Sequence, residues 1–169
     1  MGEQLNLPGR DAIRTPMQWE SGPAAGFSTG SPDSFCRPLA SRGAEGRRRT
    51  NVRDQQRDSG SLLRWFEQLI STLRECPEIG VGTCSVLDLG LPSSILAHRF
   101  DAPEGSILLL HNLDDKPLTL DLGRQTEPGE RPVEVFADGA YRPPTLRLHG
   151  LELHPWGYRW IRLRRAWAA

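Results

Sequence analysis

The chain has 169 residues, 21 basic and 21 acidic side chains and a hydrophobic fraction of 37%, a length that allows one domain, or one small domain and part of another. Proteins that bind nucleic acid or anionic membranes normally carry a net positive charge that attracts these partners over long range. This chain has zero formal net charge, so we expect neither nucleic acid nor a membrane as its partner. The sequence also lacks an apolar run near the ~18 residues of a membrane span and a secretory signal at its start, so we expect a cytoplasmic protein.

Residues 1–60 are the apolar-poor part of the chain. Only 16 of these 60 residues are apolar, against 47 of the 109 that follow. They show no helical period and no strand alternation, and a loop this long is uncommon inside a compact domain. Yet the segment holds Met17, Trp19, Phe27 and Phe35, large apolar side chains that a disordered linker has little reason to keep. We favour a segment that folds only against something outside it, with disorder as the alternative.

Residues 61–75 are predicted to form one amphipathic helix. Its apolar positions recur at spacings of three and four: Leu62, Leu63, Phe66, Leu69, Ile70 and Leu73. Asp58 or Ser61 is suited to accept hydrogen bonds from the first-turn amides. Pro77 is expected to enforce the end, because the residue before a proline is pushed out of the helical region. The stripe should dock onto a core by its Leu62, Phe66, Leu69 and Leu73 face.

From residue 83 onward the apolar period changes to two, which predicts short strands separated by turns. The expected strands are 83–88, 94–101, 106–113, 117–122, 132–137, 145–148, 151–154 and 157–163. Many short strands without intervening helices pair antiparallel, so we predict a small sandwich or barrel. The run from Ile107 to Leu110 is apolar on both faces, as in a central strand.

Cysteine and histidine usage does not indicate a metal or redox site. Cys36, Cys76 and Cys84 cannot all pair within one chain and lack the C-x-x-C spacing, so we interpret them as reduced thiols. Each of the four histidines is better explained as a strand or turn residue than as a ligand: His98, His111, His149 and His154. We expect no metal and no cofactor.

Charged clusters also have plain structural explanations. Asp114 and Asp115 lie in an expected tight turn, where aspartate caps the backbone. Solvated loop charge is the preferred reading of the arginine cluster, over phosphate binding, because acidic residues are interleaved and no aromatic lies among the arginines. That cluster comprises Arg42, Arg47, Arg48, Arg49, Arg53 and Arg57. The C-terminal arginines are expected to cover the edge of a last strand: Arg159, Arg162, Arg164 and Arg165.

The aromatic set from Trp156 to Trp160 has two explanations. These side chains could form a platform on which sugar rings stack, or they could be large residues that close a small sandwich core. We favour core packing.

Gly9-Arg10-Asp11-Ala12-Ile13-Arg14-Thr15-Pro16-Met17-Gln18-Trp19, followed by Ala25-Gly26-Phe27-Ser28, closely resembles a signature of the α-amylase superfamily, glycoside hydrolase family 13. Within it, the chain looks like the trehalose synthase and α-glucosidase branches. The resemblance continues through Glu75-Cys76-Pro77-Glu78-Ile79-Gly80 and resumes in Leu108 to Leu113 and His154 to Trp160. It covers essentially the whole chain.

The resemblance implies a mainly β fold. Residues 1–80 resemble the loop and last helix at the end of a (β/α)8 barrel, here truncated, and residues 81–165 resemble the antiparallel β-sandwich domain that follows it. In such enzymes the three catalytic carboxylates lie on earlier barrel strands, so no catalytic residue is expected in this chain. Met1 resembles interior family sequence, so we expect this chain to be a fragment whose partner is the rest of the barrel.

Two arginines are implied as substrate-binding residues. In glucosidase-like members an arginine at the position of Arg10 pairs with a barrel carboxylate and helps to hold the non-reducing glucose; Arg14 is a weaker second candidate. Arginine suits this role because it is always charged and offers a rigid fork of donors. A structural ion pair that holds the loop remains the alternative for both.

We therefore expect this chain to be the C-terminal part of an enzyme that acts on α-glucosides. That enzyme would be of the trehalose synthase (maltose glucosylmutase) type or of the α-glucosidase or α-amylase type, and this part alone would be inactive. Its substrate would be maltose or a maltooligosaccharide, and the resemblance implies retaining cleavage or rearrangement of the α-linked glucose through a covalent glucosyl-aspartate. The alternative is a free-standing β-sandwich module that binds carbohydrate or a partner enzyme.

Overall fold

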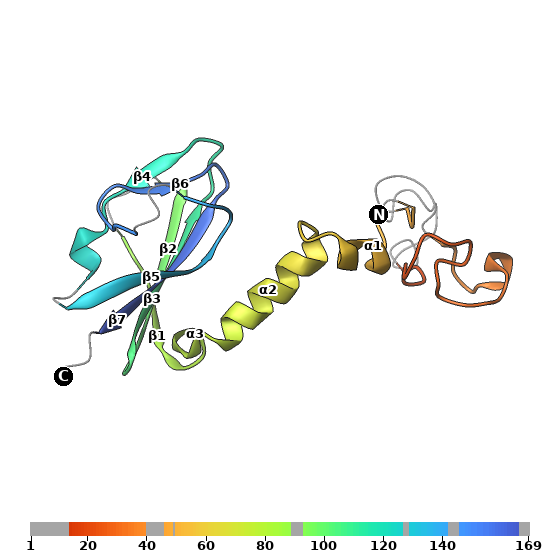
Figure 1. The fold of residues 1–169 in the computed structure, drawn as a ribbon, viewed down its shortest axis with the longest axis horizontal. Coiled ribbons are helices and arrows are strands. Elements are labelled where there is room, and N and C mark those ends of the chain that lie inside the picture. Colours follow the sequence, from red (N-terminus) through yellow and green to blue (C-terminus); the bar gives the residue numbers. More distant parts are fainter. Residues whose placement is uncertain are drawn as a thin grey trace. The chain divides into compact units, whose positions relative to one another are not determined.

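The computed structural model describes residues 14–39, 46–48, 50–88, 93–126, 129–141 and 146–165. The chain divides into two compact units, residues 1–68 and 69–169. In the first unit a short 3₁₀ helix, η3 (Pro32–Ser34), is followed by α1 (Val52–Arg57) and the start of α2 (Leu62–Arg74) (Figure 1). The second contains the end of α2, α3 (Pro77–Val81) and the seven strands found among the described residues.

The long helix forms almost where the apolar period predicts it. Ser61 begins α2, because its Oγ accepts a hydrogen bond from the Arg64 amide at 3.3 Å. Gln55 adds a second cap: its Oε1 accepts from the Leu63 amide at 3.0 Å. Pro77 lies after the end of α2 and also begins α3. In the first turn of α3 its missing N–H costs no hydrogen bond.

The apolar stripe of α2 is not covered by the residues that the structure describes. The exposed fraction is 65% for Leu62, 48% for Phe66 and 38% for Leu73, and no residue of the helix is buried. The expectation that this face docks is therefore not met within the described part of the chain.

The expected antiparallel β-sandwich is confirmed. One sheet has the order β1-β2-β3-β7-β5, and a second pairs β4 with β6. The bounds are β1 (Thr83–Val86), β2 (Ile95–Ala102), β3 (Gly105–Asn112), β4 (Leu118–Leu120), β5 (Glu130–Ala137), β6 (Leu151–Leu153) and β7 (Tyr158–Arg165). All pairings are antiparallel.

The core lies between the two sheets. Its fully buried residues come from both layers: Leu108, Leu110, Ile161 and Leu163 from the large sheet, and Leu120, Leu122, Leu151 and Leu153 from the small sheet and its flank. β3 is central and buried along most of its length, as the run of apolar residues predicts. Gly105 makes the tight β2–β3 hairpin possible: its φ is +154°, and a Cβ there would meet the Leu163 carbonyl oxygen at 2.8 Å.

Three expectations for individual segments are wrong. Residues 146–148 do not form a strand. Leu148 lies in a loop, packs into the core, and its carbonyl accepts a hydrogen bond from the Leu122 amide. Residues 52–57 form a helix in the segment expected to lack one. The C-terminal arginines do not cover an edge, because β7 lies between β3 and β5.

Candidate functional site

The first candidate region is the loop 14–39, which is organised by the N-terminus of α1. The Val52 and Arg53 amides donate to the carbonyls of Gln18 and Trp19, each at 3.0 Å. The Asn51 side chain accepts from the Asp54 amide at 3.0 Å. The loop carbonyls thus satisfy first-turn amides that no helix can satisfy by itself. This explains how a segment with almost no regular structure holds one conformation.

A left-handed turn fixes the middle of this loop. Ala25 is fully buried at φ +54°, and its carbonyl accepts from the amides of Trp19 at 2.8 Å and Glu20 at 3.1 Å. Gly26 follows at φ +66°, where a Cβ would come within 2.7 Å of Glu20 Cγ. Glycine is required there by both conformation and space.

Two arginines of the basic cluster bind residues of the loop instead of contacting only solvent. Arg53 pairs with Glu20 at 2.6 Å, and Arg47 Nε donates to the Gly22 carbonyl at 2.8 Å. Arg42 and Arg49 lie outside the described residues. Part of the cluster therefore stabilises the loop, whereas the sequence predicted only solvated charge.

One of the two sequence-predicted substrate-binding residues lies at the start of this region. Arg10 is outside the described residues, and Arg14 is the first of them, with an exposed side chain. Close by, the exposed fractions of Met17, Trp19 and Phe27 are 52%, 50% and 51%. Phe27 packs edge-on against Phe35 with centroids 5.6 Å apart. The loop is ordered by polar contacts while it presents its apolar side chains outward.

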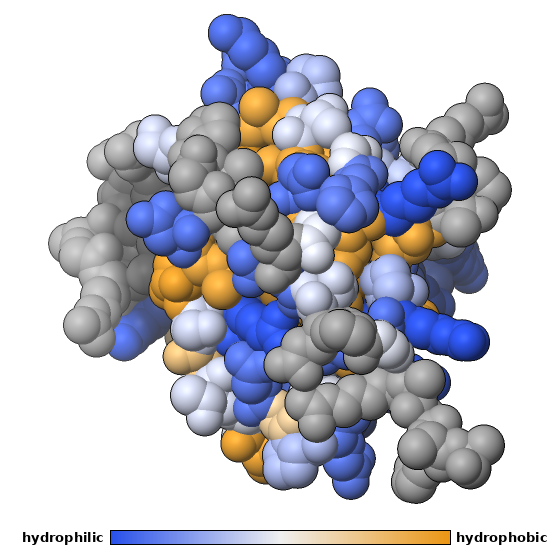
Figure 2. Space-filling view, turned by 90° about the vertical axis from the view of Figure 1, so that its left-hand side faces the viewer, coloured by the Kyte–Doolittle hydropathy of each residue, from blue (hydrophilic) through white to orange (hydrophobic). Residues whose placement is uncertain are grey.

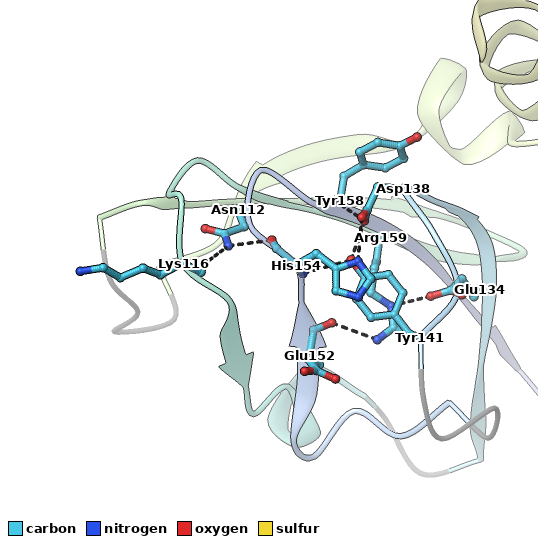
Figure 3. Close-up of polar contacts among 9 residues, drawn as sticks. All are labelled: Asn112, Lys116, Glu134, Asp138, Tyr141, Glu152, His154, Tyr158 and Arg159. Carbon is cyan, nitrogen blue, oxygen red and sulfur yellow. Dashed lines mark hydrogen bonds and ion pairs between the residues drawn. The ribbon is translucent and has the colours of Figure 1, made fainter. Parts of the chain in front are cut away.

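The second candidate region is a polar cluster at the turn between β6 and β7, which we call the Asp138 cluster: Asp138, Tyr141, His154, Arg159 and Glu134 (Figure 3). Tyr141 Oη donates to Asp138 Oδ1 at 2.5 Å, and the Tyr158 amide donates to the same oxygen at 2.9 Å. His154 Nδ1 lies 2.9 Å from Asp138 Oδ2, with its ring stacked on that of Tyr141 at 4.0 Å. Asp138 thereby ties three segments together.

Arg159 completes the cluster from β7. It is 6% exposed, its Nε is 2.5 Å from Glu134 Oε2, and its Nη1 donates to the Glu152 carbonyl at 3.1 Å. Its guanidinium carbon lies 4.1 Å from the centre of the Tyr141 ring, a cation–π contact. Arg159 was expected at a strand edge; instead it is buried by the partner strand β5.

Electrostatics fix the protonation of this cluster. Burial would raise the pKa of Asp138, but hydrogen bonds from Tyr141, His154 and the Tyr158 amide outweigh it and leave that pKa below its ordinary value. Burial and the bond to Asp138 raise the pKa of the Tyr141 hydroxyl well above its ordinary value. The pair is therefore a carboxylate and a neutral phenol at neutral pH. A pair that is saturated with hydrogen bonds in this way positions the chain segments that it joins.

Asp138→Asn should make the protein less stable at pH 7, by about 1–3 kcal/mol, because charge-assisted hydrogen bonds are lost. A depressed native pKa contributes stability above the unfolded pKa of about 3.9, and that contribution disappears as pH falls through the native value. The difference between wild type and variant should therefore shrink below about pH 4. Urea midpoints between pH 3 and 7 measure it, with the exposed Asp115→Asn as control; a gap that widens in acid contradicts the account.

The other candidate residues have structural places. Asp114 and Asp115 form the expected turn, with the Asp115 amide donating to Asp114 Oδ1 at 2.7 Å. His149 pairs with Asp121 at 2.9 Å, and burial lowers the pKa of His111. Among the described residues no group of three or more His, Cys, Asp or Glu could hold a metal ion, and no helix is long and apolar enough to cross a membrane. Cys36, Cys76 and Cys84 are free thiols.

The structure separates the aromatic set. Trp160 is 7% exposed and packs edge-on against Phe136 with centroids 5.2 Å apart, which confirms the expected core role for this residue. Trp156 is 67% exposed, so for it the expectation of core packing is wrong. Strand alternation cannot distinguish the two, because Trp156 lies in the turn before β7.

Two family models match the chain in sequence. Residues 1–80 match a model described as alpha amylase, catalytic domain, and residues 105–162 match one described as sucrose hydrolase-like, C-terminal domain.

The curated relatives are trehalose synthases and oligo-1,6-glucosidases. The chain is 31% identical to the trehalose synthase/amylase TreS of Mycolicibacterium smegmatis over 178 residues, covering 97% of this chain and 29% of that protein. It is 29% identical to the trehalose synthase of Pimelobacter sp., covering 96% and 29%. A probable oligo-1,6-glucosidase 2 of Bacillus subtilis is 35% identical over 78 residues, which is 46% of this chain and 13% of that protein. The chain thus spans less than a third of the length of the trehalose synthases it matches.

Solved structures share the fold. The trehalose-6-phosphate hydrolase TreA of Bacillus licheniformis is similar with a TM-score of 0.72 at 20% identity, over 96% of this chain and 28% of that one. The trehalulose synthase MutB of Pseudomonas mesoacidophila gives 0.66 at 22% identity, over 92% and 26%.

Proposed function

The chain belongs to the α-amylase superfamily, to whose C-terminal part it corresponds, and we propose that it is that part of an enzyme acting on α-linked glucosides, of the trehalose synthase or α-glucosidase type. Residues 1–80 would complete a catalytic barrel, and residues 81–165 would form the β-domain behind it. The reaction would be hydrolysis or rearrangement of maltose or a short maltooligosaccharide. The enzyme would work in the cytoplasm, which suits three free thiols.

The observation that carries this proposal is the contrast between the two units. The β-domain closes its own core between two sheets. The loop and α2 instead leave Trp19, Phe27 and Leu62 at least half exposed. A segment that is ordered by backbone hydrogen bonds but does not bury its apolar side chains is suited to complete a larger domain. The catalytic carboxylates would belong to that larger domain, so residues 1–169 alone would not turn over substrate.

Arg10 is the proposed substrate-binding residue of this part, with Arg14 second. Its fixed charge and two-pronged geometry would hold a barrel carboxylate and, through it, the non-reducing glucose. Arg14 is exposed at the start of the described loop, four residues further on.

We expect Arg10→Ala to lower kcat/KM for maltose roughly 10- to 100-fold in the protein extended through the coding sequence upstream of Met1. Such a loss corresponds to one charge-assisted hydrogen-bonded pair. Arg10→Lys should recover only part of it, since lysine lacks the fork. Arg14→Ala should cost less, and Arg57→Ala, an exposed arginine of α1, should cost nothing measurable.

Glucose release from maltose and from a chromogenic α-glucoside provides the measurement. Turnover by residues 1–169 alone would contradict the absence of catalytic carboxylates from this chain. Equal kinetics for Arg10→Ala and Arg57→Ala would remove Arg10 from the substrate site and leave it a structural role.

A further inference from the structure

Asn51 is a buried polar residue of the first unit. Its side chain is 2% exposed, although asparagine is usually found at the surface of proteins. On the β-domain, by contrast, the face seen in Figure 2 carries hydrophilic residues around separate apolar patches. A buried amide costs free energy unless its donor and acceptor atoms find partners. The partners of Asn51 therefore show what its burial achieves.

The Asn51 side chain binds the chain on both sides of itself. Its Oδ1 accepts a hydrogen bond from the Asp54 amide at 3.0 Å, which caps the first turn of α1. Its Nδ2 donates to the Arg47 carbonyl at 2.8 Å and to Asp54 Oδ2 at 2.7 Å. One side chain thus fixes both the start of α1 and the chain that enters this helix.

The capped turn of α1 holds one stretch of the loop backbone. The Val52 and Arg53 amides donate to the carbonyls of Gln18 and Trp19, each at 3.0 Å. The direction of these two amides is set by the first turn of the helix, which the asparagine caps. On the opposite edge of the same stretch, the Trp19 amide donates to the Ala25 carbonyl at 2.8 Å. This part of the loop is therefore held from both edges.

The chain that enters α1 holds the loop at a second place. Arg47 Nε donates to the Gly22 carbonyl at 2.8 Å, and the carbonyl of the same arginine accepts from Asn51 Nδ2. The hydrogen bonds of the Asn51 side chain itself go to Arg47 and Asp54. Asn51 therefore acts on the loop at two places, through α1 and through Arg47.

The stretch fixed in this way directly follows a proposed substrate-binding residue, because Arg14 stands four residues before Gln18. A guanidinium is sensitive to its orientation, since its rigid fork of donors matches a carboxylate or a pair of hydroxyls in few geometries. A displacement of about 1 Å at a substrate-binding group costs on the order of a hundredfold in rate. The contacts that hold the loop are therefore expected to matter for binding as well as for stability.

We propose that Asn51 is a positioning residue for the substrate. Through α1 and Arg47 it sets the orientation of the loop 14–39, and with it the binding of the non-reducing glucose. The identity of the substrate rests on the proposed function, whereas the positioning of the loop rests on the hydrogen bonds of Asn51. Asn51 itself needs no contact with the sugar.

Kinetics of the protein extended through the coding sequence upstream of Met1 test this role. We expect Asn51→Ala to raise KM for maltose about five- to twentyfold while kcat falls less than about threefold, because sugar binding is disturbed and the reacting groups are unchanged. The same rise is expected for a chromogenic α-glucoside, which shares the non-reducing glucose. A role in folding alone would lower the fraction of active enzyme, which reduces the apparent kcat and leaves KM unchanged.

Asn51→Ser tests the role in a variant that keeps the helix cap. Serine is as good a cap as asparagine, so α1 should start as in the wild type. The serine hydroxyl replaces only the capping oxygen, so the bond to the Arg47 carbonyl is lost. We expect a melting temperature close to that of the wild type and a KM between those of the wild type and Asn51→Ala. If Asn51→Ala does not fold, this variant carries the test alone, and a wild-type KM for it would overturn the proposal.

Ser61→Ala is the matched control. Ser61 also caps a helix, and its side chain is also buried. Its hydrogen bonds go to Gln55 of α1 and Arg64 of α2 instead of to the segments that hold the loop. Ser61→Ala should therefore lower the melting temperature by a few degrees and leave KM unchanged.

Amide hydrogen exchange in residues 1–169 tests the positioning independently of any activity. Asn51→Ala should speed exchange of the Trp19 amide at least about tenfold, because the loop opens more often, and Ser61→Ala should leave it unchanged. Unchanged exchange, or a KM that rises equally in Asn51→Ala and Ser61→Ala, would overturn the proposal.

Failure of this proposal and failure of the proposed function give different results. An active extended wild type with a wild-type KM for Asn51→Ala contradicts the role of Asn51 alone and leaves the proposed function standing. An extended wild type without activity on either α-glucoside contradicts the proposed function, and with it the sugar as the ligand that the loop positions.

Discussion

Glu78→Ala is expected to lower the free energy of unfolding by about 3–5 kcal/mol, because it leaves the Arg162 guanidinium buried without its charge partner. The side chains are 9% and 12% exposed, with Arg162 Nε 2.7 Å from Glu78 Oε1. Arg162 Nη2 also donates to Glu78 Oε2 at 3.1 Å and to the Glu75 carbonyl at 2.5 Å. This pair joins α3 and the end of α2 to β7.

The control is an ion pair of similar length on the surface. Arg64 and Glu67 on α2 are 2.6 Å apart, but their side chains are 43% and 49% exposed. Glu67→Ala should therefore cost only about 0.3–0.5 kcal/mol. Replacing both buried partners by apolar residues, Glu78→Leu with Arg162→Met, should recover most of the loss. A cost below about 1 kcal/mol for Glu78→Ala in urea unfolding would show that the pair does not hold α3 on the sheet.

Leu153→Ala should destabilise the β-domain by about 2–5 kcal/mol, the range for a large-to-small change in a core that cannot collapse around the cavity. Leu153 is fully buried in β6 and packs into the cluster shared by both sheets. The small sheet pairs only β4 with β6, so its attachment depends on this packing rather than on hydrogen bonds to the larger sheet.

Leu113→Ala serves as the comparison, because that leucine is 55% exposed in the same domain. It should change the unfolding free energy by less than about 0.5 kcal/mol. Equal effects of the two substitutions would mean that the small sheet is not packed as a second layer of the sandwich.

Local patterns predict the elements of this fold well. The apolar period places α2 at 61–75, against the observed 62–74, and strand alternation locates seven of the eight expected strands. Residues 146–148 fail because Leu146 and Leu148 alternate like a strand yet pack into the core from a loop. Helix α1 is too short for its period to be visible, and its start depends on loop carbonyls distant in sequence.

Pairings between distant residues could not be predicted in this way. Arg162 was expected at an edge because β7 is the last strand in sequence, whereas the order β3-β7-β5 makes it internal and brings Glu78 beside it from 84 residues away. Arg159 finds Glu134 for the same reason. The Asp138 cluster unites residues from β5, the following loop and the β6–β7 turn, so no single motif marks it.

The resemblance of residues 9–28 and 154–160 to family sequences supplied what physical patterns could not. The pattern of apolar residues predicts a loop, a helix and a sandwich, and none of these elements indicates that α-glucosides are the substrate. Conversely, the family signature does not reveal that Trp156 and Trp160, four residues apart, have opposite environments. That distinction comes from the turn geometry at Gly157.

The intact mass of the natural protein tests the central claim most directly. An antibody raised against the β-domain recovers the protein from its source cells, and mass spectrometry measures it. We predict a polypeptide roughly three times as long or more, with a barrel and its carboxylates ahead of Met1, because the chain covers 29% of the trehalose synthases of Pimelobacter sp. and Mycolicibacterium smegmatis. A natural product of 18.9 kDa, the mass of residues 1–169 alone, would contradict this account.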